Sequence, residues 1–185
     1  MSVVEKIKQK FTYQDYLKWS DKERREIIDG ETYNMSPSPT RKHQKISGNF
    51  FFELKKSLKK DKKCEIYEAP MDVILDEFNV VQPDIFVVSN HNMTSDFVDV
   101  VPLLVIEIIS SGTAYKDTKL KKDLYEKFGV LEYIIVYPDF EIVERYLLKD
   151  GKYGAPEVFN WDENLNLKSI DIVIELWEVF EKERT

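Results

Sequence analysis

The segment that most constrains the fold is residues 103–109, an almost continuous apolar run that contains one acidic residue, Glu107. Such a run is typical of a strand that is buried on both faces of a sheet. A buried carboxylate is destabilising unless it pairs with a cation or binds a metal. Glu107 is therefore a candidate metal ligand, although a Glu paired with Arg or Lys, or one at the open end of the strand, fits the same pattern.

The periodicity of the remaining chain predicts an α/β fold in which helices cover a mixed central sheet. Helices are expected over residues 13–19, 40–60, 116–128 and 171–181. A hairpin is expected over residues 26–34, and strands over residues 64–68, 71–76, 83–88, 103–110, 131–137 and 142–148. A length of 185 residues suits a single domain, residues 1–185.

The composition predicts a soluble protein of the cytoplasm. Hydrophobic residues make up 43% of the chain and charged residues 33%, enough for a core and a solvated surface. Cys64 is the only cysteine, so no internal disulfide can form, which is typical of a reducing compartment. No targeting segment and no apolar run long enough to span a bilayer is present, so no membrane partner is expected.

A second acidic residue, Asp84, follows Pro83 in the apolar segment 80–88. Proline marks a strand start or an edge, and alternation places Gln82 and Asp84 on one face. A turn aspartate beside a proline is the alternative interpretation. Together with Glu107, Asp84 forms a pair of strand carboxylates suited to a hard metal ion.

The helix expected over residues 116–128 supplies a candidate cation. With Leu120 at zero and about 100° per residue, Leu124 and Phe128 fall at about 40° and 80°. Lys121 falls at about 100°, inside this apolar arc, and is predicted to point towards the sheet. The lysines outside the arc are Lys119, Lys122 and Lys127. A lysine at the edge of the stripe with its ammonium in solvent is the alternative.

The same construction places His43 inside the apolar arc of the helix expected over residues 40–60, where it is either a core histidine or a functional one. Phe52 falls on the polar side of that helix. Because exposed aromatics mark contacts between chains, Phe52, together with Trp177 and Phe180, predicts a homodimer.

Two strand carboxylates and a lysine are the residue set of the PD-(D/E)xK nuclease superfamily, and this sequence resembles its Uma-two family of restriction-endonuclease-like proteins. The resemblance spans about residues 12 to 180. The matching motifs are Glu26-Ile27-Ile28-Asp29-Gly30-Glu31, Met35-Ser36-Pro37, His43-Gln44, Val80-Val81-Gln82-Pro83-Asp84, Ile106-Glu107-Ile108-Ile109-Ser110, Asp117 with Lys121 and Tyr125, Gly129-Val130 and Glu132-Tyr133.

The resemblance implies a restriction-endonuclease-like sheet and metal-dependent cleavage of phosphodiester bonds in nucleic acid, with DNA as the expected substrate and Mg²⁺ or Mn²⁺ as cofactor. It implies Asp84 and Glu107 as metal ligands. The superfamily lysine is normally two residues after the glutamate, where this chain has Ile109, and Lys121 matches the position to which the family displaces it.

Further roles follow for residues around this set. Glu26 is a candidate for extending the metal site or acting as a base, and His43 and Gln82 for orienting the ligands. Asp117 lies one helical turn before Lys121 and can pair with it, and Tyr125 belongs to the same motif. The basic residues expected to face phosphates are Arg41, Lys42, Lys45, Lys116, Lys119, Lys121 and Lys122.

The acidic charge of the chain favours one of two alternative functions, a non-enzymatic one. A net charge of −7 argues against binding nucleic acid through bulk electrostatics. One alternative is a non-enzymatic module that keeps the nuclease fold for dimerisation or protein binding. Another is a metal-dependent hydrolase of a small phosphate ester.

Overall fold

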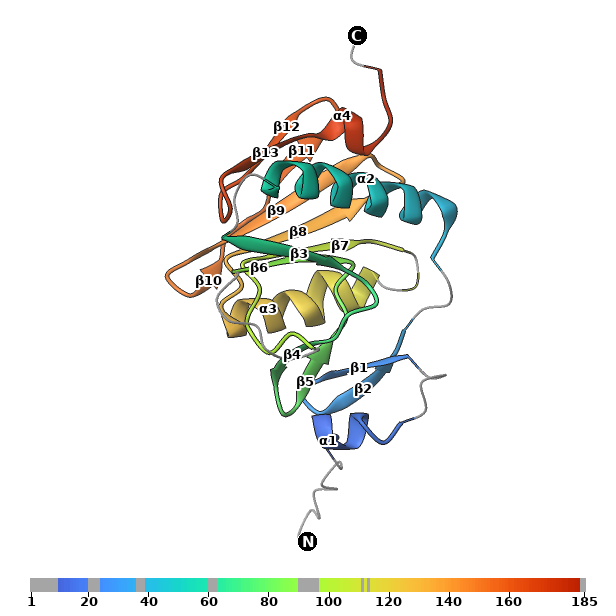
Figure 1. The fold of residues 1–185 in the computed structure, drawn as a ribbon, viewed down its shortest axis with the longest axis vertical. Helices are drawn as coiled ribbons and strands as arrows, with labels where there is room; N and C mark the ends of the chain where they lie inside the picture. The colour runs from blue at the N-terminus through green and yellow to red at the C-terminus, as the bar shows by residue number, and fades with distance from the viewer. Residues whose placement is uncertain are drawn as a thin grey trace, which may run out of the picture.

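A computed structural model describes residues 10–19, 24–35, 39–59, 63–89, 97–110, 112 and 114–183. Ser36 and Pro37 of the family motif lie outside these ranges. The main element is a seven-stranded sheet in the order β10-β9-β8-β7-β6-β3, with β11 paired to β9 (Figure 1). Its strands are β3 (Cys64–Glu68), β6 (Ile85–Ser89), β7 (Leu104–Ile108), β8 (Glu132–Tyr137), β9 (Ile142–Lys149), β10 (Lys152–Tyr153) and β11 (Glu157–Asn160). Strands β7 and β8 are parallel and the other pairs antiparallel, so the predicted mixed sheet is confirmed.

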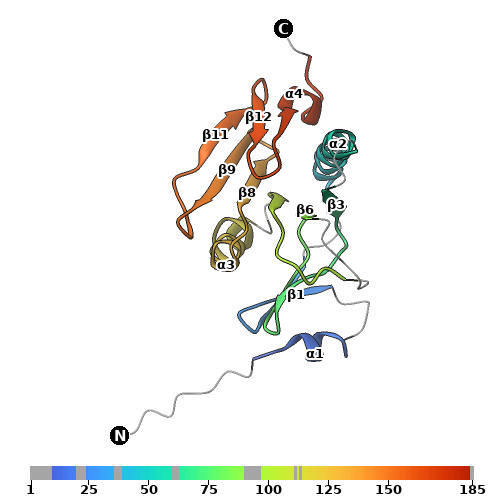
Figure 2. The same ribbon diagram turned by 60° about the vertical axis from the view of Figure 1, so that its left-hand side comes forward.

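Two apolar layers cover the central sheet, one on each face (Figure 2). Helix α2 (Arg41–Leu58) packs on one face beside the hairpin of β12 (Asn164–Leu167) and β13 (Ile172–Glu175) and helix α4 (Leu176–Val179). The other face is covered by α3 (Lys122–Phe128), which continues a π-helical segment, η1 (Lys116–Lys121). Alternation along β7 sends Ile106 and Ile108 towards α2, and Val105 and Glu107 towards α3.

A second sheet, in the order β2-β1-β5-β4, stands beside the α3 face of the central sheet (Figure 1). It contains β1 (Arg25–Ile28), β2 (Glu31–Asn34), β4 (Val73–Asp76) and β5 (Asn79–Val81), and α1 (Tyr13–Tyr16) precedes it. The predicted turn at Asp29 and Gly30 is confirmed, with φ of 50° and 81°. Since β5 ends at Val81 and β6 starts at Ile85, the chain passes between the two sheets at residues 82–84, which positions Gln82 and Asp84.

The predicted helix over residues 171–181 is wrong in its first half. Residues 172–175 form β13, and only the short α4 follows. Ile172 and Ile174 pack on the core and alternate with the solvent-facing Val173 and Glu175. This period of two is typical of a strand and prevails over helix formation. Trp177 is also buried, at 6% exposure, and therefore packs within the chain rather than offering a dimer contact, whereas Phe52 is 63% exposed.

None of the helices that the structure describes has the length and apolar character needed to cross a membrane.

Candidate active site

Asp84 and Glu107 meet where β6 and β7 begin to separate. Ile85 pairs with Ile106 in antiparallel register, so one further step sets Asp84 opposite Glu107. The Asp84 backbone N–H lies 3.4 Å from Glu107 Oε2, and the Ile108 N–H donates to Asp84 Oδ2 at 2.8 Å. Each carboxylate thus contacts the backbone of the other residue's strand, and the two residues are neighbours at this point of the sheet.

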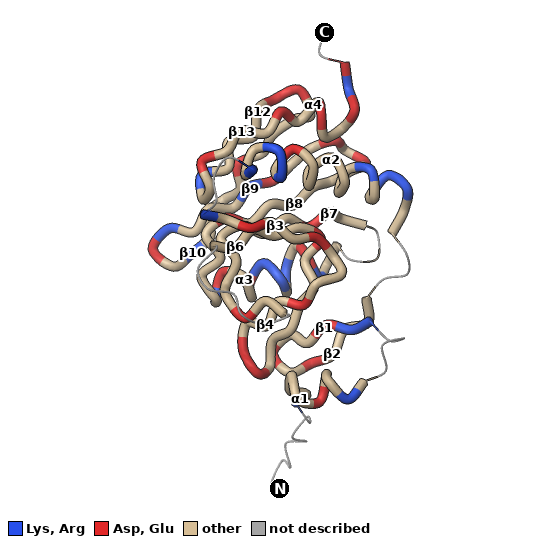
Figure 3. The backbone as a smooth tube through the Cα atoms, viewed as in Figure 1, with Lys and Arg blue, Asp and Glu red and all other residues tan. Residues whose placement is uncertain are grey.

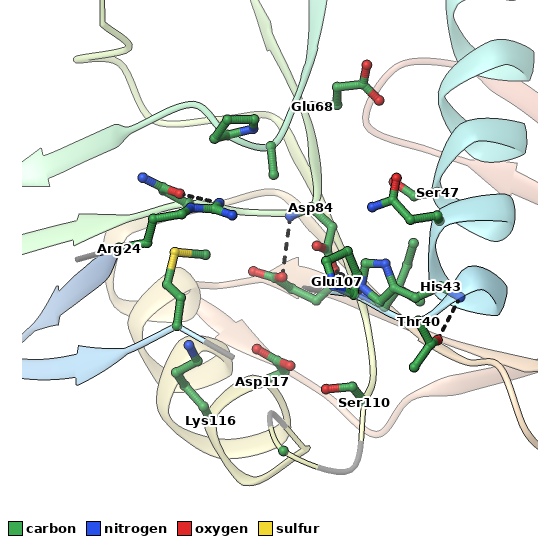
Figure 4. Close-up of a pocket in the computed structure, with 18 of the residues that line it drawn as sticks. Arg24, Thr40, His43, Ser47, Glu68, Asp84, Glu107, Ser110, Lys116 and Asp117 are labelled. Carbon is green, nitrogen blue, oxygen red and sulfur yellow. Dashed lines mark hydrogen bonds and ion pairs between the residues drawn. The ribbon is translucent and has the colours of Figure 1, made fainter. Parts of the chain in front are cut away.

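Both side chains line a cavity of about 660 Å³ (Figure 4). Glu107 forms part of its floor and is 3% exposed, whereas the Asp84 side chain is 21% exposed. The walls come from the first turns of α2, from η1, from the strands around Arg24 and Met35, and from the segment Ala69–Pro70. A ligand in this cavity reaches Asp84 first and Glu107 behind it.

Lys121 points into the sheet, as its helical position predicted. Its Nζ lies 2.8 Å from Glu107 Oε1 and 2.7 Å from Glu26 Oε1, with Asp117 Oδ1 at 3.8 Å. The Tyr125 hydroxyl donates to the same Glu107 oxygen at 3.0 Å. The π-helical turn that carries Asp117 and Lys121 is a rare distortion that occurs frequently at functional sites.

Glu26 is fully buried behind this cluster and does not line the cavity. It accepts from the Gln82 N–H at 3.0 Å and forms ion pairs with Lys121 and Lys116. Burial favours the neutral acid, but the two ammonium groups outweigh burial and hold the pKa of Glu26 below its usual range. Glu26 is thus an ionised partner of the lysines.

The cluster contains more carboxylates than cations. Burial raises the pKa of Glu107; Lys121 opposes this, but Asp117, Asp84 and Glu26 reinforce it, so that the pKa reaches about 8. Four carboxylates, on Glu26, Asp84, Glu107 and Asp117, face two ammonium groups, on Lys116 and Lys121. A bound cation would offset this surplus and favour ionised Glu107.

His43 and Gln82 hold other parts of the site. His43 Nε2 lies 3.2 Å from Asp84 Oδ2, and Thr40 caps the first turn of α2 by accepting from the His43 N–H at 3.2 Å. Burial lowers the pKa of His43, but the contact with Asp84 raises it by more than burial lowers it, so the net shift of the pKa is upwards. Gln82 Oε1 accepts from Arg24 at 2.7 Å, and its Nε2 donates to Asp72 at 2.7 Å.

Comparison with known proteins identifies the family of this chain. The Uma2 family model, described as "Putative restriction endonuclease", matches residues 13–176. The chain belongs to the Uma2 family. The match includes every candidate site residue from Glu26 to Tyr125, and confirms the predicted resemblance. This family description indicates a nuclease-like function: a hydrolase that acts on phosphodiester bonds, with nucleic acid as substrate. Restriction-endonuclease-like families generally use divalent metal ions.

A solved structure supports the fold of this Uma2 chain. It is entitled "Crystal structure of a putative nuclease belonging to DUF820 from Anabaena variabilis ATCC 29413 at 1.96 A resolution". The two chains superpose with a TM-score of 0.78 at 18% sequence identity, over 92% of this chain and 98% of the other. No curated protein matches the sequence.

The basic residues of this Uma2 protein are arranged differently from the sequence-based expectation. Among the seven proposed, only Lys116 and Lys121 line the cavity. Four others have partners elsewhere: Lys42 with Asp139, Lys45 with Glu181, Lys119 with Asp123, and Lys122 with the ring of Tyr146. Arg24, which does line the cavity, was missed because a residue just before a short strand carries no periodic signal.

Proposed function

We propose that this protein is a metal-dependent endonuclease that hydrolyses phosphodiester bonds of nucleic acid, with DNA as the expected substrate and Mg²⁺ or Mn²⁺ as the cofactor. One observation carries the proposal. Asp84 and Glu107 line a common cavity, and the ammonium of Lys121 lies 2.8 Å from Glu107 behind them. Such an arrangement of carboxylates and a cation suits metal-assisted hydrolysis at phosphorus.

The donor set suits a hard divalent ion. Asp84 and Glu107 would hold it through carboxylate oxygens. Among the residues that the structure describes, no three His, Cys, Asp or Glu side chains are grouped closely enough to form an ion site by themselves. The other coordination positions would fall to water and substrate phosphate, as Mg²⁺ prefers. Bound there, the ion would polarise a phosphoryl oxygen and activate a water.

Lys121 serves as a fixed positive charge in this proposal. Burial alone would lower the pKa of Lys121, but Glu107, Glu26 and Asp117 raise it well above its usual value. The ammonium therefore keeps its proton and offsets negative charge that develops on the transferring phosphoryl group. A proton-accepting role for Lys121 is disfavoured for the same reason.

The neighbouring side chains act as positioning residues. Glu26 holds Lys121 and Lys116, a position that favours orientation of the ammonium groups over a role as base. Tyr125 orients Glu107, and His43 orients Asp84, through the hydrogen bonds described above. Mutation of residues that support metal ligands in this way typically lowers metal affinity or activity by about 10- to 100-fold.

A panel of substrates tests the proposal. The protein is incubated with Mg²⁺ or Mn²⁺ and with linear, nicked and single-stranded DNA and with RNA, beside Glu107→Gln as control. Cleavage that needs the metal and disappears in the control is expected. Metal-dependent hydrolysis of small phosphate esters but of no polynucleotide would contradict the proposal and favour the small-ester hydrolase.

The non-enzymatic alternative has its own supporting observations. The net charge is −7, and Phe52 is 63% exposed on α2, with Lys56 over its ring at 5.9 Å. These features suit a homodimer or a protein-binding surface. Light scattering at micromolar concentration, with Phe52→Ser for comparison, tests the homodimer: a dimeric mass that becomes monomeric in the variant is expected, and a monomeric wild type contradicts it.

A further inference from the structure

The two long walls of the cavity differ in charge. Arg24 and Lys116 lie on one wall, next to the second sheet and η1 (Figure 4). Helix α2 forms the facing wall with small or neutral polar residues, among them Gln44, Ser47 and Gly48. Asp84 lies between the walls, so a phosphate at the carboxylates has Arg24 and Lys116 on one side and, on the α2 side, the imidazole of His43, which already contacts Asp84.

Arg24 is held by a neutral partner. Its guanidinium donates to Gln82 Oε1 at 2.7 Å, and Gln82 is fixed in turn by Asp72 and by Glu26. Among the residues that the structure describes, no carboxylate lies within ion-pair distance of Arg24. The guanidinium is thus oriented without being neutralised, which leaves its charge for a phosphate oxygen.

Gly48 leaves space on the facing wall. It lies inside the 18-residue helix α2, where glycine is a poor helix former. A Cβ added to Gly48 would meet no heavy atom within 4 Å, so packing within the protein does not require glycine here. A Cβ would instead reduce the width of the cavity that Gly48 lines.

Besides the buried Lys121, few cations face the cavity: Arg24, which is bonded to neutral Gln82, and Lys116, which also pairs with Glu26. A volume of about 660 Å³ falls within the range of small-ligand sites, roughly 300–1,000 Å³. Near the mouth, Lys42 and Lys45 pair with Asp139 and Glu181. Lys and Arg are interspersed with Asp and Glu along the chain rather than gathered in one band (Figure 3). Binding along two duplex backbones would require such a band.

We propose that the cavity binds a single strand of nucleic acid, an unpaired segment or end, with its backbone between Gly48 of α2 and the Arg24–Lys116 wall. Arg24 contacts a phosphate next to the one at Asp84 and Glu107, and Gly48 provides clearance for the strand. This inference rests on the proposed function and defines its substrate class.

The first test compares two substrates of one sequence. A fluorescein-labelled single-stranded oligonucleotide and the corresponding blunt duplex are incubated with Mg²⁺. Cleavage of the single strand at least about tenfold faster than the duplex is expected. Equal or faster cleavage of the duplex overturns the inference, yet leaves the proposed nuclease function intact.

The second test uses Gly48→Ala, with fluorescence anisotropy of the labelled single strand in Ca²⁺ as the readout. Alanine is the better helix former, so Tm should stay equal or rise, while the Kd of the strand rises about tenfold. Gly154→Ala is the matched control, because a Cβ at Gly154 also meets nothing within 4 Å and Gly154 lines a separate cavity. An unchanged Kd in Gly48→Ala overturns the inference.

The third test uses the salt dependence of the same binding. Arg24→Gln should decrease the slope of log Kd against log salt concentration by about 0.7, the value for one phosphate contact on a single strand. Lys59→Gln, at the far end of α2, should leave the slope unchanged. An unchanged slope in Arg24→Gln contradicts the inference. If no polynucleotide is cleaved with any metal, the nuclease function fails, and the two binding tests still decide whether the cavity holds a strand.

Discussion

The central sheet buries two acid–base pairs, and they differ in what surrounds them. Glu107 and Lys121 lie at the end of β7, while Glu132 at the start of β8 faces Arg145 on β9. All four residues are at most 3% exposed. The closest nitrogen and oxygen atoms are 2.8 Å apart in the first pair and 3.8 Å in the second.

The Glu132–Arg145 pair is held by contacts of its other atoms, although the facing Oε1 and Nε atoms make no hydrogen bond within the described part of the chain. Glu132 Oε2 accepts from the backbone N–H and the hydroxyl of Ser169 at 2.9 and 2.8 Å. Arg145 donates to the Asn166 carbonyl and pairs with Glu157. Because Asn166 and Ser169 belong to the β12–β13 hairpin, these contacts attach the hairpin to the central sheet.

The Glu107 cluster, by contrast, has two carboxylates more than its ammonium groups and opens on a cavity. Burial of an acid–base pair is thus common to a structural contact and a candidate active site. The surplus of one charge next to a cavity distinguishes the second, because a proton on Glu107 or a cation that enters the cavity can offset it.

The largest expected effect is that of Lys121→Met. Turnover should fall by at least about 100- to 1,000-fold, since the fixed charge near the phosphoryl group is lost. The free energy of unfolding should also fall, by about 3–5 kcal/mol, because Glu26 and Glu107 lose a buried partner. Cleavage rates of the folded fraction and urea unfolding measure the two effects.

A double variant separates the two roles of Lys121. Adding Glu26→Gln removes one of the two carboxylates that lose Lys121, although Glu26 also pairs with Lys116, so Lys121→Met/Glu26→Gln should regain part of the lost stability and none of the activity. Recovery of turnover together with stability would mean that Lys121 only neutralises its neighbours.

Glu107→Gln should lower activity by about 100- to 1,000-fold without loss of stability. The change removes one carboxylate from a crowded cluster, and Lys121 keeps Glu26 as its partner. Binding of Mg²⁺ should raise the Tm of the wild type, and this rise should be absent in the variant. A decrease in stability with normal cleavage would mean that Glu107, like Glu132, only stabilises the fold.

Glu132→Gln should have the opposite result. Loss of the buried charge beside Arg145 should lower the free energy of unfolding by roughly 3 kcal/mol, while Glu157 still pairs with the guanidinium. The folded fraction should cleave at the wild-type rate. Reduced turnover per folded molecule, with Tm unchanged, would refute the distinction between the two pairs.

The parts of the fold and site that follow a local period could be predicted from sequence. The apolar run around Glu107 marked β7, and the helical positions of Lys121 and His43 placed both side chains towards the sheet. Glu132 shows the limit of this approach. It was matched only as part of a family motif, because its pairing with Arg145 depends on strand register, which no local pattern records.

Contacts between distant segments account for the other errors. Arg24 reaches the site through Gln82, 58 residues away, and Lys116 reaches Glu26 across 90 residues. The segment 172–175 was assigned to a helix because its pairing partner, β12, was not recognised as a strand. Basic residues near the motif were expected to face phosphate because the carboxylates that pair with them are distant in sequence.

The smallest expected effects are those of Lys42→Gln and Lys45→Gln, which extend the comparison to the surface of α2. Both lysines were predicted from sequence to face phosphates, yet each lies next to a carboxylate, Asp139 or Glu181. A lysine whose charge is already balanced releases few counterions from a bound strand. Neither change should therefore alter measurably the slope of log Kd against log salt concentration, whereas Arg24→Gln should decrease it by about 0.7. Tm should also stay unchanged, since exposed ion pairs contribute little to stability. Anisotropy titrations at several salt concentrations measure the three slopes side by side. A decrease for Lys42→Gln or Lys45→Gln as large as that for Arg24→Gln would mean that these ion pairs open when the strand binds, and that the basic surface extends from the cavity along α2.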